Sequence, residues 1–524
     1  MFGVRAWLGA LGLACVSCAD APPRPVAASA PTSPPARLDA PRPPSPVVAT
    51  SASPAGDPAP VGPAAAPPRA SLTSVGYFTW IYKTPKVDDH AYLGYVRFGQ
   101  RVALKREALV RGLGCAKGFY AIEPRGFVCR DHTVDLAPPP RFEAEAEAVA
   151  PASGALPFHY ALSNGAPMYA RLPSEKEQAK VERAYGKAGA FVRLPKVLAA
   201  HEELARAAPV AAVDAPPGFV VDGAPLLPER LDLVKQPIPA GSMLSFTRSF
   251  EANGRTWLLS ADLTLVPADR VRAFEPSRFH GTKIGGDVAL PIAWFKGAGA
   301  QKHLVSAGAV TASSASFAPR TFVAITGAEV EIAGTKYLET RAPLGDGRAW
   351  VAARDATVVE AAEKLPYLVS PGERWIVVSI SKGTLVAYDG LTPVYSTLVS
   401  PGKGGVPVAG RDLVESATTP LGAFRITFKD RAATMSPEQG EGRSFWIADV
   451  PFTQYFAPPF ALHAAYWHER FGEPTSAGCI NLSPLDAEAL FDFTEPRVPD
   501  GWAGATGASA MKENGRASWI VIRR

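Results

Sequence analysis

The chain has 524 residues, more than one hydrophobic core organises, which indicates about three folded units. Hydrophobic residues make up 47% and charged residues 20%, so most of the chain can bury an ordinary core. Lysine and arginine exceed the acids by 54 − 49 = 5 and form no run interleaved with aromatic residues, which argues against nucleic acid as a partner. No apolar run reaches the ~18 residues of a membrane span, which excludes a polytopic membrane protein.

The N-terminus has the order of an export signal. Residues 1–18 begin with one basic residue, Arg5, continue with a short apolar stretch and end in small residues. Cys15 and Cys18 resemble the lipid-modified cysteine of a lipoprotein signal, with Cys18 the better candidate, although neither has the favoured leucine three residues upstream. The sequence therefore predicts an exported protein of the periplasm or cell envelope, either tethered to the membrane by an N-terminal lipid or released by plain cleavage.

Residues 19–70 are rich in proline and alanine and show no apolar period. Such a segment cannot bury enough surface to offset the entropy of ordering it, so we expect an extended linker. We interpret it as a spacer.

Five cysteines are present, two of them in the signal region. Cys115 and Cys129 bracket two short strand-like segments around a turn, and a disulfide closing this 15-residue loop stabilises an exported protein by about 3 kcal/mol in the chain-entropy model. We predict that disulfide. Cys479 then remains as a thiol, which is either an inert core residue or a nucleophile.

The middle of the chain predicts small β modules. Aromatic and β-branched residues alternate with turn residues over 71–140, in a pattern that resembles a bacterial SH3-like barrel. An acidic linker is expected at 142–151, and further β modules with a short helix over 150–368. The helix is expected at 174–186, behind a capping box formed by Ser174 and Glu177, and Asn253-Gly254 predicts a hairpin. These modules are either packing units that position the next domain or cell-wall-binding units.

Residues 370–524 predict a meander of strands followed by a short helix. Strand patterns occur at 375–380, 385–388 and 393–399, and again after the turn at Thr419-Pro420. The block 461–468 (Leu-His-Ala-Ala-Tyr-Trp-His at 462–468) precedes the block 476–483 (Ser-Ala-Gly-Cys-Ile-Asn-Leu-Ser). A helix should begin at Pro484 behind the N-cap Ser483.

In their order and spacing, these blocks resemble the L,D-transpeptidase catalytic domain of bacterial cell-wall enzymes, over about residues 372–505. The resemblance implies a mainly β protein: SH3-like modules followed by a β-sandwich with a short helix after the catalytic cysteine. It implies peptidoglycan stem peptides as substrate, carbapenem-type β-lactams as inhibitors, and no cofactor. No cluster of histidines, cysteines and carboxylates has metal-ligand spacing, so we expect no metal.

The resemblance assigns the nucleophile to Cys479 and the general base to His463. A thiol with an ordinary pKa of ~8.5 is only a few per cent ionised at neutral pH, so a neighbouring imidazole must take its proton. The backbone N–H groups of Gly478 and Cys479 are the expected oxyanion donors, and Ser476 is expected to orient the loop.

Four further residues are expected to bind substrate, namely Tyr466, Trp467, His468 and Asn481. His468 is the alternative base, and Asn481 and Trp467 have a purely structural alternative. One position departs from the family pattern, because Ala477 stands where a second histidine is usual. That removes a second imidazole from beside the thiol.

The expected reaction is the formation of 3→3 cross-links through a thioacyl-enzyme. One alternative is an L,D-carboxypeptidase or hydrolase that uses the same Cys–His pair with water as the acceptor. Another is a wall-binding scaffold whose catalytic domain has lapsed, which Ala477 and the long modular N-terminal part would favour.

Overall fold

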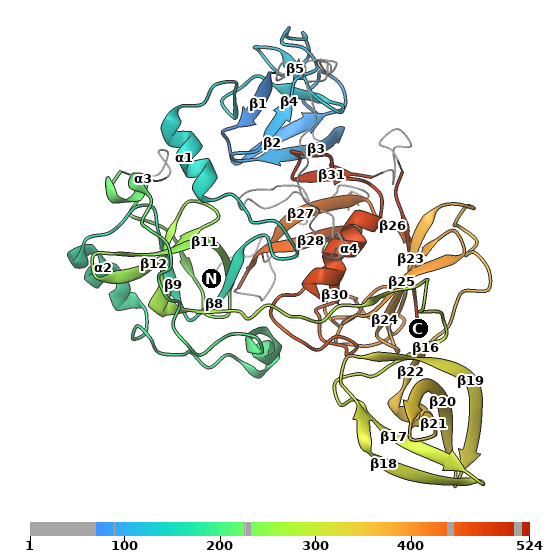
Figure 1. The fold of residues 1–524 in the computed structure, drawn as a ribbon. Helices are drawn as coiled ribbons and strands as arrows, with labels where there is room; N and C mark the ends of the chain where they lie inside the picture. The colour runs from blue at the N-terminus through green and yellow to red at the C-terminus, as the bar shows by residue number, and fades with distance from the viewer. Residues whose placement is uncertain (1–69, 89, 225, 227–231, 437–444, 508–515) are drawn as a thin grey trace, which may run out of the picture.

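A computed structural model describes residues 70–88, 90–224, 226, 232–436, 445–507 and 516–524 (Figure 1). The expected export signal with Cys15 and Cys18, and the expected linker up to residue 69, lie outside the described residues. Where the structure is described, no helix is long and apolar enough to cross a membrane. The protein is mainly β, as predicted, with four named α-helices among the described elements.

Module 1 is the first β unit, residues 70–135. Its strands are β1 (Ser71–Ser74), β2 (Phe78–Tyr82), β3 (Tyr92–Arg97), β4 (Arg101–Ala103), β5 (Phe119–Ala121), β6 (Phe127–Cys129) and β7 (Val134–Asp135). They enclose a core that includes Leu72, Ile81 and Val128. Cys115 and Cys129 form a disulfide.

The acidic segment after module 1, where the sequence predicts a linker at 142–151, contains a helix. Helix α1 (Pro140–Ala148) has proline at its first position, where the fixed φ suits a helix start. Arg141 pairs with Glu145 one turn later, and the ring of Phe142 packs 4.7 Å from that of Phe98. Alanine and glutamate are strong helix formers, and this packing against module 1 orders them.

Module 2, residues 156–275, is a second β unit. Its strands are β8 (His159–Ser163), β9 (Ala166–Tyr169), β10 (Val234–Ile238), β11 (Met243–Ala252), β12 (Arg255–Ser260), β13 (Leu265–Pro267) and β14 (Val271–Ala273). The predicted hairpin joins β11 to β12, and Asn253 and Gly254 take φ values of 50° and 69°. Both residues tolerate the left-handed conformation that this turn requires.

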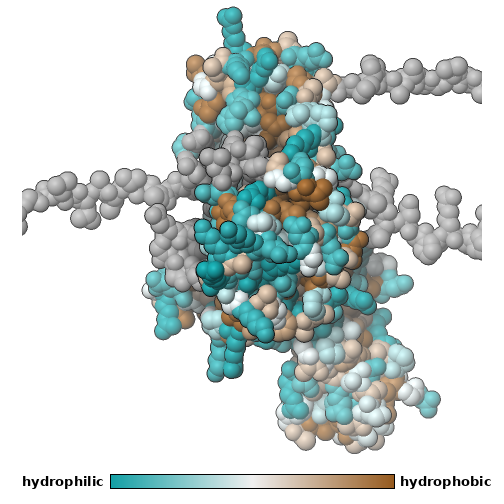
Figure 2. Space-filling model, turned by 90° about the vertical axis from the view of Figure 1, so that its left-hand side faces the viewer, coloured by the Kyte–Doolittle hydropathy of each residue, from teal (hydrophilic) through white to brown (hydrophobic). Residues whose placement is uncertain are grey.

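The helical pieces of module 2 lie between its strands. They are α2 (Glu175–Val181), η1 (Glu182–Ala184), η2 (Lys196–Glu202) and α3 (Gly218–Val221). The predicted capping box of Ser174 and Glu177 is confirmed, and α2 buries none of its residues. Figure 2 views the molecule from the side that module 2 occupies in Figure 1, and hydrophilic side chains cover much of the middle of that face.

Module 3 is a seven-stranded sheet that projects from the body (Figure 1, lower right). Its strands are β16 (Ile292–Trp294), β17 (Ala300–Ser306), β18 (Ala309–Phe317), β19 (Phe322–Ile332), β20 (Thr335–Leu344), β21 (Gly347–Ala352) and β22 (Thr357–Val359). The short 3-10 helices η3 (Ala268–Arg270) and η4 (Ala353–Asp355) belong to modules 2 and 3.

The C-terminal domain is built from two sheets around one core. The first has the order β15-β25-β24-β23-β32-β26, and the second contains β27 to β31. Their bounds are β15 (Thr282–Lys283), β23 (Arg374–Ser379), β24 (Thr384–Asp389), β25 (Thr392–Leu398), β26 (Gly422–Arg425), β27 (Phe428–Met435), β28 (Ile447–Ala457), β29 (Phe460–Ala464), β30 (Ile480–Leu482), β31 (Gly504–Thr506) and β32 (Trp519–Arg523).

Helix α4 (Pro484–Phe493) packs between these sheets, directly after β30. Ser483 caps it by accepting a hydrogen bond from the Asp486 N–H at 3.1 Å, as the sequence predicts. The buried carboxylate of Asp486 accepts from the Thr397 hydroxyl at 2.6 Å, which fixes the helix start to β25. At the other end, the buried ammonium of Lys429 donates to the carbonyls of Phe491 and Thr494. Both ends of the helix are therefore tied to strands.

Modules 1 and 2 join the second sheet of the C-terminal domain. Strand β3 pairs with β31, and β11 pairs with β28 through Met243 and Ile447. At this junction the guanidinium of Arg97 lies 3.2 Å from the carboxylate of Asp449, and both side chains are at most 3% exposed. The Ser245 hydroxyl donates to the same carboxylate. One acidic residue thus connects both modules to the domain.

Candidate active site

The register of two short parallel strands places the predicted base beside Asn481, two residues after the predicted nucleophile. Leu462 of β29 is opposite Ile480 of β30, and His463 is opposite Asn481. Leu462 and Ile480 belong to the core that includes α4. Because side chains alternate along a strand, His463 and Asn481 lie on the face away from α4, and Cys479 immediately precedes β30.

His463 is buried and neutral at physiological pH. Its side chain is 3% exposed, and burial lowers its pKa to about 4. Nδ1 lies 3.0 Å from the carbonyl oxygen of Ala464. A carbonyl only accepts, so Nδ1 carries the proton and Nε2 keeps its lone pair. This tautomer suits a group that takes a proton through Nε2.

The loop before β30 holds Cys479 at the surface, and hydrogen bonds fix its backbone. The Ser476 hydroxyl accepts from the Gly478 N–H at 3.0 Å and donates to the Cys479 carbonyl. Thr419 donates to the Gly478 carbonyl at 2.8 Å. Cys479 is partly exposed, and its Sγ lies 3.9 Å from the Pro459 carbonyl oxygen. The hydrogen-bonded loop therefore holds the thiol in a fixed position with access to solvent.

The C-terminal region matches a known protein family. The model of the YkuD family, the L,D-transpeptidase catalytic domain, matches residues 373–501. The C-terminal region is an L,D-transpeptidase catalytic domain. No curated protein was found to match the chain.

Solved transpeptidase structures are distant from this chain. An L,D-transpeptidase domain from Xylanimonas cellulosilytica is 20% identical over 30% of this chain and 64% of its own, with a TM-score of 0.19. A cysteine-to-serine mutant of the Enterococcus faecium enzyme is 17% identical over 29% and 50%, with a TM-score of 0.21. This chain thus covers less than two thirds of the length of each of these two proteins. The transpeptidase LdtMt1 in complex with imipenem is 17% identical over 38% and 97%, also at 0.21.

One of the two expected oxyanion donors already makes a hydrogen bond within the loop of residues 476–479. The Gly478 N–H, which the sequence assigns to the oxyanion, donates to the Ser476 hydroxyl instead. Gly478 can reach an oxyanion only by releasing that bond. The expected loop-orienting position of Ser476 agrees with the two hydrogen bonds that this side chain makes. Ala477 is exposed, so the position of the usual second histidine lies at the loop surface.

Gly478 is required by backbone geometry. Its φ is 127°, and a Cβ there would lie 2.6 Å from the ring of Phe460. We expect Gly478→Ala to cost about 1–3 kcal/mol of stability and to displace Cys479, which lowers the rate of thiol acylation. Acylation kinetics and thermal unfolding measure both effects. Gly308→Ala is the control, because Gly308 has φ 77° but open space around it. Equal acylation rates in both variants would contradict the expectation.

The four residues expected to bind substrate lie inside the molecule. Tyr466, Trp467, His468 and Asn481 are all at most 4% exposed. The Tyr466 ring stacks 3.9 Å from that of Tyr160, and its hydroxyl donates to the Ala448 carbonyl. Module 2 packs over residues 466–468 of the C-terminal domain. No pattern in the sequence near these residues indicates that another module buries them.

His468, the alternative base, has both ring nitrogens engaged. Nδ1 accepts from the Arg470 N–H at 3.2 Å, and Nε2 lies 2.9 Å from the Asn481 side-chain amide. Because Nδ1 accepts, the neutral ring carries its proton on Nε2, and the Asn481 amide must then present its oxygen to that N–H. Burial is the main reason that the His468 pKa falls to about 3. Neither nitrogen is available to a thiol, so the geometry favours His463 as the base.

The depressed His468 pKa makes stability depend on pH. Because the folded pKa lies below the unfolded value of 6.5, the stability it contributes is present above pH 6.5 and lost as the pH falls toward about 3. We expect the stability gap between wild type and His468→Gln to narrow by about 2 kcal/mol between about pH 7.5 and 5. Denaturant unfolding at both pH values measures this. A gap that widens on acidification would refute it.

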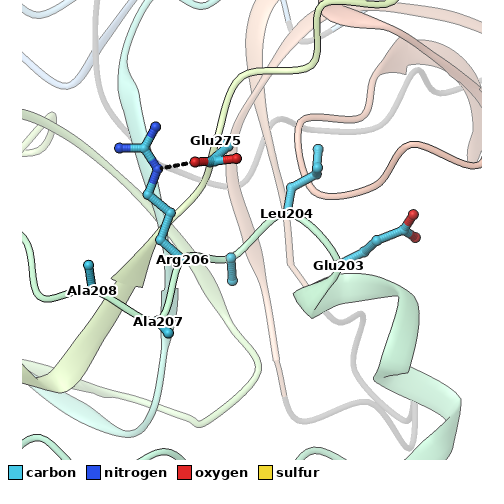
Figure 3. Close-up of a pocket in the computed structure, with 7 residues that line it drawn as sticks. Glu203, Leu204, Arg206, Ala207, Ala208 and Glu275 are labelled. Atoms are coloured by element: carbon cyan, nitrogen blue, oxygen red, sulfur yellow. Dashed lines mark ion pairs between the residues drawn. The ribbon is translucent and has the colours of Figure 1, made fainter.

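A pocket of about 590 Å³, open to solvent, lies directly after η2 of module 2. Residues 203–208 and Glu275 line it (Figure 3). Arg206 and Glu275 form an ion pair across it at 2.9 Å. None of the transpeptidase residues discussed above lines this cavity, so we treat it as separate from the Cys479 face.

Proposed function

We propose that the protein is a cysteine-dependent L,D-transpeptidase that forms 3→3 cross-links in peptidoglycan. The observation that carries the proposal is the β29–β30 register, which sets a neutral, oriented His463 beside Asn481, two residues along the chain from a partly exposed Cys479. The family match to residues 373–501 supports the substrate class.

The first half of the reaction forms a thioester. His463 Nε2 takes the proton of the Cys479 thiol, and the thiolate attacks the carbonyl carbon of the third residue of a donor tetrapeptide stem. The tetrahedral intermediate collapses, the bond to the terminal D-Ala breaks, and the imidazolium returns its proton to that amine. The Cys479 N–H, in the rigid loop, is the proposed oxyanion donor.

The second half transfers the acyl group. A side-chain amine from a neighbouring stem attacks the thioester, His463 removes its proton, and the thiolate leaves. The products are an amide between two third residues and a regenerated thiol. Water in place of the amine would give a trimmed stem, so the acceptor decides between cross-linking and hydrolysis.

The proposed setting is the cell envelope. The sequence of residues 1–18 favours export, with or without a lipid on Cys18, and peptidoglycan lies on that side of the membrane. Solved relatives include a complex with imipenem and an avibactam carbamoyl-enzyme. By the same chemistry we propose that carbapenem-type β-lactams acylate Cys479.

The test is incubation of purified protein with disaccharide tetrapeptides, followed by mass spectrometry. The proposal expects dimers whose mass corresponds to the loss of one D-Ala, and none with Cys479→Ala. Trimmed monomers without dimers would show a hydrolase and refute the proposed transpeptidase. Unchanged substrate, together with no carbapenem adduct on Cys479, would favour the lapsed wall-binding scaffold.

A further inference from the structure

The indole of Trp467 lies between the proposed base and module 2. Its ring centroid is 5.9 Å from that of His463, at an interplanar angle of 32°. On another side it is 6.2 Å from the ring of His201, at 63°. Trp467 is 4% exposed, so these neighbours fill its surroundings. One aromatic side chain thus connects the His463 ring to a residue in another module.

Module 2 holds the segment that carries Trp467 through several contacts. The Leu204 N–H donates to the Trp467 carbonyl at 3.3 Å, and Glu203 pairs with Arg470 at 2.9 Å. Tyr160 stacks on Tyr466 next to it. His201 itself lies in η2 and packs edge-on against Phe445, with ring centroids 5.1 Å apart. Module 2 therefore fixes the Trp467 backbone and the ring of its neighbour Tyr466.

The orientation of His463 depends on this packing. A single hydrogen bond, from Nδ1 to the Ala464 carbonyl, sets the ring from one edge. Rotation about that hydrogen bond is limited by the indole that covers the ring at a shallow angle. A base must hold its lone pair within a few tenths of an ångström of its target. Loss of the packed Trp467 indole should therefore lower the rate at which His463 takes the proton.

We propose that module 2 completes the catalytic centre, with His201 as a positioning residue that holds Trp467 against His463. The inference rests on the proposed function only in taking His463 as the base of Cys479. It assigns to module 2 a role in the reactivity of the thiol, beyond joining domains.

The experiment measures the rate of Cys479 alkylation by iodoacetamide across pH in the full-length protein. His201→Ala removes the ring, His201→Phe restores a ring without ionisable nitrogen, and His159→Ala is the matched control in the same module. His159 is exposed and packs on Phe246, within module 2. Thermal unfolding of each variant reports folding separately.

We expect His201→Ala to slow alkylation near neutral pH by about 10- to 100-fold and to move its pH midpoint toward that of an ordinary thiol. His201→Phe should behave nearly as wild type, and His159→Ala as wild type. His201→Gln provides the same test should the alanine variant not fold.

An unchanged pH profile in folded His201→Ala or His201→Gln would overturn the proposal. So would a His201→Phe variant as defective as His201→Ala, because the imidazole and not ring packing would then matter. Alkylation needs no stem peptide, so these outcomes are independent of whether the protein cross-links. A reactive, His201-dependent thiol without cross-links would defeat the proposed function alone.

Discussion

Replacing Cys479 by alanine is expected to remove cross-linking by at least about 10⁴-fold, without unfolding the domain. The thiol is the only group proposed to bond to the substrate, and nothing nearby replaces its sulfur. The loop should survive, because the hydrogen bonds of Ser476 and Thr419 hold backbone atoms of the loop and not the sulfur. Muropeptide assays and thermal unfolding of the same samples measure both parts.

His463→Gln is the companion variant. A general base contributes about 10²–10⁴-fold, so we expect a smaller loss than for Cys479→Ala. Combining the two should add nothing to the Cys479 effect, because the base acts only through the thiol. Residual cross-linking by Cys479→Ala above the rate of a no-enzyme control would show that another residue is the nucleophile.

Breaking the Arg97–Asp449 pair should give the largest loss of stability, about 3–5 kcal/mol for Arg97→Met. Both side chains are nearly inaccessible, and Arg97 also donates to the Ala432 carbonyl at 2.7 Å. Its removal leaves the Asp449 carboxylate buried, where burial already raises its pKa to about 6 despite the guanidinium. Denaturant unfolding at neutral pH measures the difference.

The double variant Arg97→Met with Asp449→Asn should recover most of that loss, because it removes the uncompensated charge. Asparagine suits position 449, where φ is 45° and the Ser245 hydroxyl is a neighbour. Lys336→Met breaks the half-exposed Lys336–Glu329 pair and serves as the control, with an expected cost below about 1 kcal/mol. A loss no larger for Arg97→Met than for this control would refute the expectation.

Much of the site can be predicted from local sequence because its chemistry is local. Ser476, Gly478 and Cys479 lie within four residues, and the structure gives them one hydrogen-bonded loop. The same reasoning does not extend to the surroundings of Tyr466 and Trp467. Aromatic residues beside a motif are equally compatible with a substrate groove and with a domain interface, and only distant residues such as Tyr160 and His201 decide between them.

By itself the sequence determined the β character, the turn at Asn253-Gly254, the cap at Ser483 and the family of the C-terminal domain. Each depends on φ preferences, side-chain periodicity or motif spacing over a few residues. Only the tertiary structure decided that residues 140–148 form a helix, that Gly478 N–H is engaged and that module 2 covers Trp467. Those outcomes depend on contacts between segments far apart in the chain, whose free energies no local pattern encodes.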